Sequence, residues 1–410
     1  MKKYAFAGSG GRGVTMFAVP MANEFKDVAE IVGVYDTNLK RCEVMRRRTG
    51  LDIPVYSDFD KMLEEAKPDI VVVATVDRYH HEYIEKALKA GCDVICEKPL
   101  TIDEEKCGTI VKAQKETGKK VTVTFNVRFM PFVTRIKQLV KEGSIGEILS
   151  VHFEWMLDTS HGADYFRRWH RRKENSGGLL VHKSTHHFDM VNWLIEDEPA
   201  IVNAFGTRRF YGPVRSERGE RCLTCPHRET CEFYFDIKAS SLNREFYYEC
   251  EDADGYFRDR CVFDDEIDIE DTVSVSVAYS KGAVMSYSLT AHSPYEGFRI
   301  ALNGTKGRIE AEDFHGSIGP FAGKHITNLR LYNRMGEEID IKVPPAAGSH
   351  GGGDARLLKM LFREGQADPL GHMADTRAGI MSAVIGIAAN KSMKENRSVN
   401  VKELLPPDMI

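Results

Sequence analysis

Short apolar runs alternate with helical segments over the first part of the chain. Each run is rich in Val, Ile or Phe and ends at a glycine or a polar loop. Continuous apolar runs of this kind are typical of buried strands in a parallel sheet, whose connections are helices. The runs cover residues 4–7, 31–35, 70–74, 93–96 and 121–125. They predict an α/β domain over residues 1–125.

A different pattern marks the rest of the chain, where apolar and polar residues alternate one by one. Residues 272–279 alternate cleanly, and residues 283–290 answer them across a Ser-Lys-Gly turn, which predicts a hairpin. Further strands are expected over residues 148–155, 202–208, 298–302 and 308–312, and a helix near 131–142. We therefore predict a second, α+β domain over residues 126–410.

The first strand leads directly into a loop with G-x-G-x-x-G spacing. Gly8 allows a tight turn, Gly10 lets the backbone approach a pyrophosphate, and Gly13 lets helix and strand pack closely. The helix that follows directs free N–H groups at phosphates. The next strand ends at Asp36, which can accept both ribose hydroxyls. This context predicts a Rossmann dinucleotide-binding domain, and the alternative is a glycine-rich turn without a nucleotide.

Asp36 also selects between the nicotinamide dinucleotides, because a carboxylate at this place repels the 2′-phosphate of NADP. We expect NAD rather than NADP, although Arg41 would partly offset that charge. The residues that the motif assigns to the cofactor are Gly8, Ser9, Gly10, Gly11, Arg12, Gly13, Asp36 and Arg41.

Net charge and apolar content limit the kinds of partner that the chain can be expected to bind. The 410 residues carry a formal net charge of −5, which disfavours a nucleic-acid or membrane-surface partner. No apolar run approaches the roughly 18 residues that cross a bilayer. The chain also starts with a strand and not with a cleavable apolar segment. We expect a cytoplasmic protein.

The tripeptide Glu97-Lys98-Pro99 follows a buried run, on the side of the sheet where open α/β domains bind ligands. Pro99 fixes the backbone there, and a cis bond would fit. Lys98 beside a nicotinamide would hydrogen-bond a substrate hydroxyl and help to move its proton. The alternative is a surface lysine after a strand.

Further motifs follow in a fixed order along the chain. They are Thr75 to His80, Phe125-Asn126-Val127-Arg128-Phe129, and Gly177-Gly178-Leu179-Leu180 with His186 and Asp189. With the glycine loop and the Glu-Lys-Pro tripeptide, this set resembles the glucose–fructose oxidoreductase/inositol dehydrogenase (Gfo/Idh/MocA) family. The resemblance extends to a branch with an HGGGD run and a His-Lys pair near the matching His.

The resemblance implies a Rossmann domain, then a domain with a large open, mostly antiparallel sheet, and a C-terminal helix that returns to the first domain. It implies a sugar, polyol or related substrate, and a homodimer or homotetramer that pairs through the open sheet. It also adds residues to the expected nicotinamide cofactor site, namely Thr75, His80, Glu97, Lys98 and Asn126.

The chemical centre is expected within residues 177–189. Many members of the family carry an Asp and, four residues later, a His on one helical face. Here His186 matches the His, but His182 stands where the Asp would be. His182 would bind substrate, form a relay with His186, or share a divalent metal with it. The remaining alternative is a pair of core histidines.

Other polar residues are expected to contact the substrate. An aromatic and basic stretch over residues 161–172 would stack on a sugar ring and bind its hydroxyls, and the acidic total charge disfavours a nucleic-acid patch. The HGGGD run at 350–354 would be a linker with an N-cap Asp354, or a loop pointing His350 and Asp354 inwards. The substrate set is Arg128, Tyr165, Arg168, Trp169, His182, Lys183, His187 and His350.

An insertion over residues 212–266 holds five of the nine cysteines. Cys222 and Cys225 form a C-x-x-C pair, which is a common metal half-site. Cys231 and Cys261 would complete a tetrahedral structural zinc site, with Cys250 or His227 as further candidates. Disulfides, free thiols and an iron–sulfur cluster are the alternatives.

The combined prediction is an NAD-dependent oxidoreductase that oxidises a secondary alcohol of a sugar, glycoside or cyclitol. His186 would take the hydroxyl proton while Lys98 polarises the same oxygen. The main alternative is a redox-neutral enzyme that oxidises one carbon, then cleaves a glycoside by elimination or epimerises the sugar, and reduces the product again with bound NAD. A non-catalytic NAD-binding sensor is the third reading.

Overall fold

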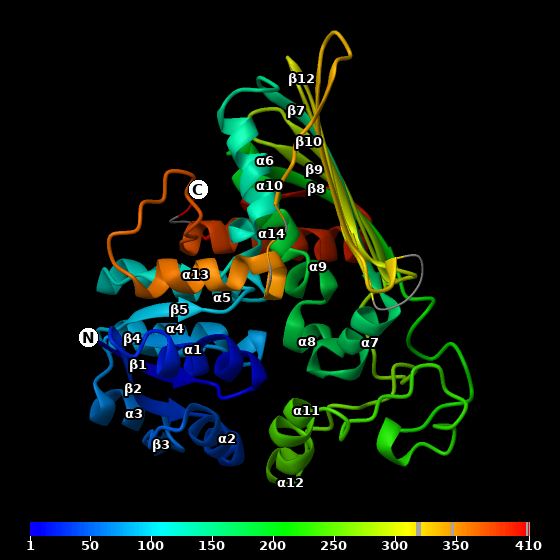
Figure 1. Cartoon of the computed structure of the whole chain (residues 1–410). Helices are drawn as coiled ribbons and strands as arrows, with labels where there is room; N and C mark the ends of the chain where they lie inside the picture. Colours follow the sequence, from blue (N-terminus) through cyan, green and yellow to red (C-terminus); the bar gives the residue numbers. More distant parts are fainter. Residues whose placement is uncertain (317–320, 345, 347, 407–408, 410) are drawn as a thin grey trace.

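The computed structural model describes residues 1–316, 321–344, 346, 348–406 and 409. The first 125 residues form a six-stranded parallel sheet in the order β3-β2-β1-β4-β5-β6, with helices between the strands (Figure 1). The strands are β1 (Lys2–Ala7), β2 (Ala29–Tyr35), β3 (Val55–Tyr56), β4 (Ile70–Val73), β5 (Asp93–Cys96) and β6 (Val121–Val123). The helices are η1 (Gly13–Ala18), α1 (Val19–Asn23), α2 (Leu39–Thr49), α3 (Phe59–Ala66), α4 (His80–Lys89) and α5 (Glu104–Thr117).

Local chemistry sets several of these boundaries. Asp58 and Asp103 accept backbone N–H groups in the first turns of α3 and α5, as N-cap residues do. Gly50 and Gly118 end α2 and α5 in the left-handed conformation that glycine adopts without strain. The helices therefore begin and end where sequence signals stand, which fixes the loops at the carboxyl ends of the strands.

The second part of the chain contains a nine-stranded sheet in the order β14-β13-β12-β11-β7-β10-β9-β8-β15. Its strands are β7 (Ile148–Asp158), β8 (Pro199–Thr207), β9 (Thr272–Tyr279), β10 (Val284–Ser293), β11 (Glu296–Gly304), β12 (Gly307–His315), β13 (His325–Asn333), β14 (Glu338–Asp340) and β15 (Val399–Asn400). The pair β7 and β10 is parallel and the other neighbours are antiparallel, so the sheet is mixed. The hairpin predicted between 272–279 and 283–290 is present as β9–β10. The sequence patterns did not foresee β13 and β14.

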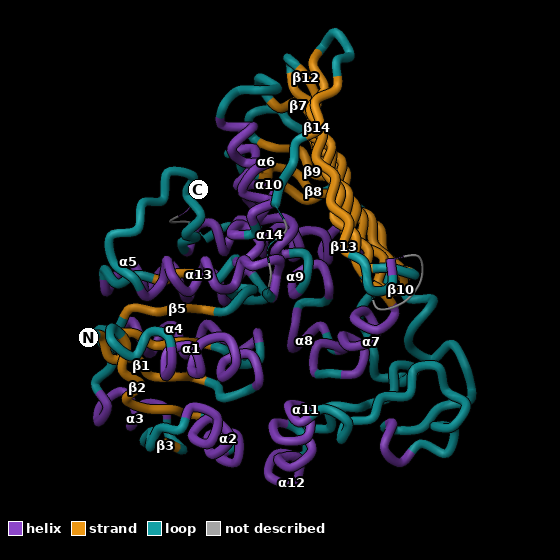
Figure 2. The backbone as a smooth tube through the Cα atoms, viewed as in Figure 1, coloured by secondary structure: helices purple, strands orange, loops and turns teal. Residues whose placement is uncertain are grey.

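Helices cover one face of this large sheet and leave the other face open (Figure 2). They are α6 (Pro131–Lys141), α7 (Thr159–Arg167), α9 (Leu179–His182), α10 (Thr185–Ile195) and α14 (Thr376–Glu395), while α8 (Lys173–Ser176) lies toward the first domain. The predicted single helix with His182 and His186 on one face is wrong. The chain breaks between α9 and α10, so these two residues lie on separate helices.

The C-terminal part returns to the first domain through α13 (Gly353–Phe362). Phe362 packs edge-to-face on Tyr4, with ring centroids 5.5 Å apart, and also contacts Phe25. The later helix α14 packs against α10 and β8 in the second domain. None of the described helices is long and apolar enough to cross a membrane. Because α13 packs on the first domain, the two domains are in contact, and a site can form where they meet.

Candidate active site

A cavity of about 610 Å³ lies at the carboxyl ends of β1, β2 and β4. The glycine loop forms one side of it, and residues from the second domain form another. Its lining includes Gly8, Gly10, Gly11, Arg12, Tyr35, Asp36, Arg41, Thr75, Tyr79, Arg168, Trp169, Tyr247, Asp254 and Tyr256. Ligands bind at this edge in open α/β sheets, so its position is that of a dinucleotide pocket.

The glycines of the loop fit a dinucleotide for separate steric reasons. Gly8 has a φ of +95°, and a Cβ there would lie 2.5 Å from the Ala74 carbonyl oxygen. A Cβ at Gly13 would lie 2.9 Å from the Gly8 oxygen, so this glycine permits close helix–strand packing. A Cβ at Gly10 would meet nothing within 4 Å, which means that Gly10 borders open space. A pyrophosphate could approach the backbone at that point.

Asp36 holds the base of the pocket. Its carboxylate accepts hydrogen bonds from the backbone N–H groups of Ser9, at 2.7 Å, and Asn38, at 2.8 Å. Arg41 lies 3.9 Å from Asp36 but is bound more closely to Asp254 of the insertion, at 2.7 Å. Arg41 also donates to the Phe246 carbonyl oxygen at 3.1 Å. Arg41 is thus already engaged by protein groups.

Lys98 and His182 meet at the chemical end of the cleft. The Lys98 Nζ donates to the backbone oxygen of His182 at 3.1 Å, and the Lys98–Pro99 bond is cis. Burial lowers the pKa of Lys98 to about 8, even though the charge of Asp77 opposes that change. A lysine with such a pKa can exchange a proton near neutrality.

Asp77, which sequence reasoning did not single out, contacts His182. Its Oδ2 lies 2.5 Å from the His182 Nδ1, and both side chains are buried. Burial raises the pKa of Asp77 and lowers that of His182 well below its ordinary value. A carboxylate that accepts the Nδ1–H leaves Nε2 of the ring as a proton acceptor. The loop after β4 therefore supplies the carboxylate that position 182 lacks.

His170 links this centre to the dinucleotide pocket. Its ring stacks on Trp169, a residue of the pocket wall, with centroids 3.7 Å apart, and lies 4.1 Å from the His182 ring. Burial, followed by the charge of Arg168, lowers the pKa of His170 well below its ordinary value. The only signal in the sequence was its place in the aromatic and basic stretch.

His186 and His187 point to different surroundings. His186 packs edge-to-face against Phe125, and its Nδ1 has no hydrogen-bond partner among the described residues. Burial, then the charge of Lys98, holds the pKa of His186 well below its ordinary value, so its imidazole is neutral at pH 7. His187 instead stacks on Trp155 and bonds to the Tyr287 hydroxyl at 2.7 Å, inside the core under the large sheet.

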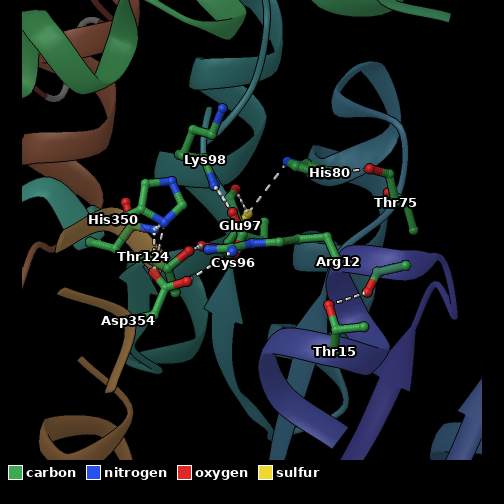
Figure 3. Close-up of polar contacts among 12 residues, drawn as sticks. Arg12, Thr15, Thr75, His80, Cys96, Glu97, Lys98, Thr124, His350 and Asp354 are labelled. Carbon is green, nitrogen blue, oxygen red and sulfur yellow. Dashed lines mark hydrogen bonds and ion pairs between the residues drawn. The ribbon is translucent and has the colours of Figure 1, made fainter. Parts of the chain in front are cut away.

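A polar network ties the HGGGD run to the first domain (Figure 3). The Arg12 guanidinium forms ion pairs with two carboxylates: its Nε lies 2.8 Å from Glu97 Oε1, and its Nη1 lies 3.3 Å from Asp354 Oδ2. The Asn126 amide donates to Asp354 Oδ1 at 2.6 Å and contacts His350 Nδ1 at 3.0 Å. Burial by itself would raise the pKa of Asp354. The hydrogen bond from His350 and the charge of Arg12 outweigh this effect and lower the pKa to about 2. Asp354 lies in the first turn of α13 and is not its N-cap.

Two expected site residues have their polar groups bound within the protein. His80 is buried, with Nδ1 2.9 Å from the Pro99 oxygen and Nε2 3.3 Å from the Thr75 oxygen. Arg128 forms a buried pair with Asp189 at 2.6 Å and 2.7 Å. His80 therefore holds two loops of the site in place, and Arg128 joins elements of the second domain.

The remaining expected substrate residues surround the centre. Tyr165 contacts His161 at 3.0 Å and lies edge-to-face on the His182 ring. Lys183 lies over the face of Trp155, 4.9 Å from its centroid, and burial lowers the pKa of Lys183 although Glu296 opposes this. Arg168 and Trp169, by contrast, line the dinucleotide pocket itself.

The four predicted zinc ligands of the insertion come together around one cavity of about 20 Å³. Arg167 donates to Cys222 Sγ at 3.1 Å, and Arg215 donates to Cys231 Sγ at 3.0 Å. Within the described part of the chain, no three of the four sulfurs of Cys222, Cys225, Cys231 and Cys261 lie within 4.8 Å of one another. The structure groups these thiols without a tetrahedral arrangement, and the zinc site stays a prediction.

Asp313, His315 and His325 are a group whose ligand atoms do lie within 4.8 Å of one another. They lie at one end of β12 and β13, where His315 and His325 are cross-strand partners. His325 Nε2 also lies 2.8 Å from Asp313 Oδ1, so a hydrogen bond accounts for the contact without an ion. Sequence reasoning did not foresee this group, because β13 was not expected.

Comparison with known proteins defines the class. Residues 2–125 match the family described as "Oxidoreductase family, NAD-binding Rossmann fold", and residues 137–401 match "Oxidoreductase family, C-terminal alpha/beta domain". The chain therefore belongs to the Gfo/Idh/MocA oxidoreductases and has an NAD-binding Rossmann domain, as the motifs predicted.

Individual relatives give a finer context. The chain is 39% identical to the "Putative oxidoreductase YteT" of Bacillus subtilis, over 98% of this chain and 99% of that protein. It is 32% identical to the inositol 2-dehydrogenase of Rhizobium meliloti, over 43% of this chain and 50% of that protein. A solved structure of levoglucosan dehydrogenase in complex with NADH and levoglucosan has a TM-score of 0.66 at 22% identity, over 98% of this chain and 99% of that chain. This last likeness supports the fold alone.

Proposed function

We propose that this protein is an NAD-dependent dehydrogenase that oxidises a secondary alcohol of a sugar, glycoside or cyclitol. The observation that carries the proposal is the meeting of Lys98, His182 and Asp77 beside the dinucleotide pocket, with a neutral His186 close to Lys98. Relatives that act on inositols, glucosides and levoglucosan support a polyhydroxylated substrate.

Bound NAD would supply the hydride acceptor. Neutral His186 would accept the hydroxyl proton, because burial lowers its pKa and so favours the unprotonated ring. Protonated Lys98 would donate a hydrogen bond to the same oxygen and stabilise its developing negative charge. His182, with its Nδ1–H held by Asp77, would present Nε2 as an acceptor for a neighbouring hydroxyl.

The test is absorbance in the reduced-nicotinamide band while the purified protein meets sugars, glycosides and inositols with added NAD. Steady accumulation of NADH with one compound would support a dehydrogenase and identify its substrate. Consumption of a substrate without NADH would favour the redox-neutral enzyme. NAD binding with no substrate consumed across the panel, and an unchanged biological function of a His186→Ala variant, would favour a sensor.

We also propose that the open face of the large sheet pairs with a second copy of the chain. The support is the exposed apolar side chains on its strands, above all Phe205 on β8, which is 73% exposed. Phe205→Glu would place a charge on that face, and sedimentation of the wild type and the variant would test the pairing. A wild-type monomer, or an unchanged oligomer of the variant, would contradict the proposal.

A further inference from the structure

One part of the insertion packs against the nucleotide-binding domain. The segment 241–256 contains α11 (Ser241–Phe246) and α12 (Glu251–Asp254), and α11 contacts α2 (Figure 1). Phe246 and Cys250 are fully buried in the same apolar cluster as Phe17 and Val44 of the first domain. Burial of this kind gives the segment a fixed position on the Rossmann domain.

Polar contacts hold the same segment at several points. Asn38, next to the pocket, donates to the Cys250 carbonyl oxygen at 2.9 Å. Arg48 forms a two-point pair with Glu245, at 3.0 and 3.1 Å. Two-point Arg–carboxylate pairs fix orientation as well as distance. The segment is therefore held in one orientation beside the adenosine end of the pocket.

The segment supplies one wall of the pocket. Tyr247, Asp254 and Tyr256 line the cavity opposite the glycine loop. A Cβ added at Gly11 would lie 3.5 Å from the Tyr247 hydroxyl oxygen, which shows how closely this wall approaches the loop. Any dinucleotide on the glycine loop would consequently be covered on that side by residues of the insertion.

Asp254 adds a second carboxylate beside Asp36. It binds Arg41 at 2.7 Å, and Arg41 also donates to the Phe246 oxygen. Arg41 is the residue that could offset the charge of Asp36 and accept a 2′-phosphate. Because Asp254 of the insertion already pairs with this guanidinium, a 2′-phosphate would meet two carboxylates and an arginine that has a partner.

We propose that residues 241–256 form a cofactor clamp that slows NAD release through the Tyr247 wall and excludes NADP through the Asp254–Arg41 pair. The inference rests on NAD binding in this pocket. It gives the insertion a role in cofactor specificity and retention, independent of whether its cysteines hold a metal.

The test measures binding and needs no substrate. Affinities for NAD and NADP are determined by calorimetry, and NAD release is followed by displacement from the loaded protein. In Asp254→Asn, we expect the ratio of NADP to NAD affinity to rise about tenfold. In Tyr247→Ala, we expect NAD to dissociate about tenfold faster. Asp252→Asn is the matched control, because Asp252 lies on the same short helix but pairs with Lys40 outside the pocket.

The outcomes distinguish a failure of the proposed function from a failure of the clamp. A wild-type protein that binds neither dinucleotide would overturn the proposed function and the clamp together. Tight NAD binding with wild-type selectivity in Asp254→Asn and wild-type release in Tyr247→Ala would overturn the clamp alone. Melting temperatures of the variants show whether the fold is intact, and Tyr247→Phe, which keeps the wall, should restore slow release.

Discussion

The adenosine end and the chemical end of the cleft are built in different ways. At the adenosine end, the turn, the phosphate loop and the ribose acid all lie on one unit, β1 to β2, within the first 36 residues. At the chemical end, Asp77, Lys98 and His182 come from three separate elements, two in the first domain and one in the second. Substitutions in the local unit at the adenosine end should therefore weaken cofactor binding. Substitutions at the composite chemical end should instead slow the reaction.

The adenosine end and the chemical end also differ in how their charged groups are held. The Asp36 carboxylate accepts hydrogen bonds from the backbone N–H groups of Ser9 and Asn38, which is a local arrangement. The chemical end instead buries an amine and several imidazoles together, so the pKa values of Lys98, His170, His182 and His186 are all lowered. Lowered pKa values favour the unprotonated imidazoles and bring the titration of Lys98 closer to neutral pH, as proton transfer requires.

The largest expected effect separates the two ends through Lys98. We expect Lys98→Met to lower kcat about a thousandfold, because the developing oxyanion loses its charged donor, while the affinity for NAD changes by less than about threefold. Steady-state kinetics and calorimetry measure the two quantities. Lys89→Met, an exposed lysine paired with Glu85, is the control. A variant of Lys98 with normal kcat would remove this residue from the mechanism.

Asp77→Asn tests whether the carboxylate holds the imidazole tautomer. We expect kcat to fall about a hundredfold, since an amide that donates to Nδ1 would move the ring proton to Nε2. In the double variant with His182→Asn, the losses should not add, because both changes disrupt one pair. Additive losses would mean that Asp77 acts independently of His182. Asp60→Asn, an exposed acid on α3, serves as the control.

Substitutions at two glycines of the loop should separate an effect on cofactor binding from an effect on backbone conformation. Gly10→Ala should leave the melting temperature unchanged and weaken NAD binding about tenfold, because the added methyl group faces only the space for the cofactor. Gly8→Ala should cost about 1–3 kcal/mol of unfolding free energy, since it combines a φ of +95° with a steric clash. Equal thermal effects in the two variants would contradict this division. Calorimetric scanning and NAD titration give the answer.

The smallest expected effect is in the pH profile. Lys98, with a pKa of about 8, is mostly protonated at pH 7 and loses its proton above pH 8. The rate of alcohol oxidation should therefore fall about fourfold from pH 7 to pH 8.5 if the ammonium form is needed. Burial, then the charge of Lys98, lowers the pKa of His186, so a modest fall in pH below 7 should not reduce the rate through this residue. A rate that rises through pH 8 would instead identify the neutral amine as the base.

Local signals in the sequence predicted some parts well. The glycine loop, Asp36 and the hairpin β9–β10 were predicted because a few neighbouring residues determine each of them. His182 and His186 were expected on one helix, but the helix breaks between them, and spacing alone could not show that break.

The sequence by itself determined the Rossmann unit with its nucleotide-binding loop, because strand periodicity and glycine spacing are local properties of the chain. The resemblance to an oxidoreductase family also came from the sequence, through a set of short motifs in a fixed order. Only the tertiary structure decided which polar groups meet. Asp77 and His182 are 105 residues apart in sequence, and Arg41 and Asp254 are farther still. Contacts at such separations depend on how the domains and the insertion pack, and no local pattern of residues encodes them.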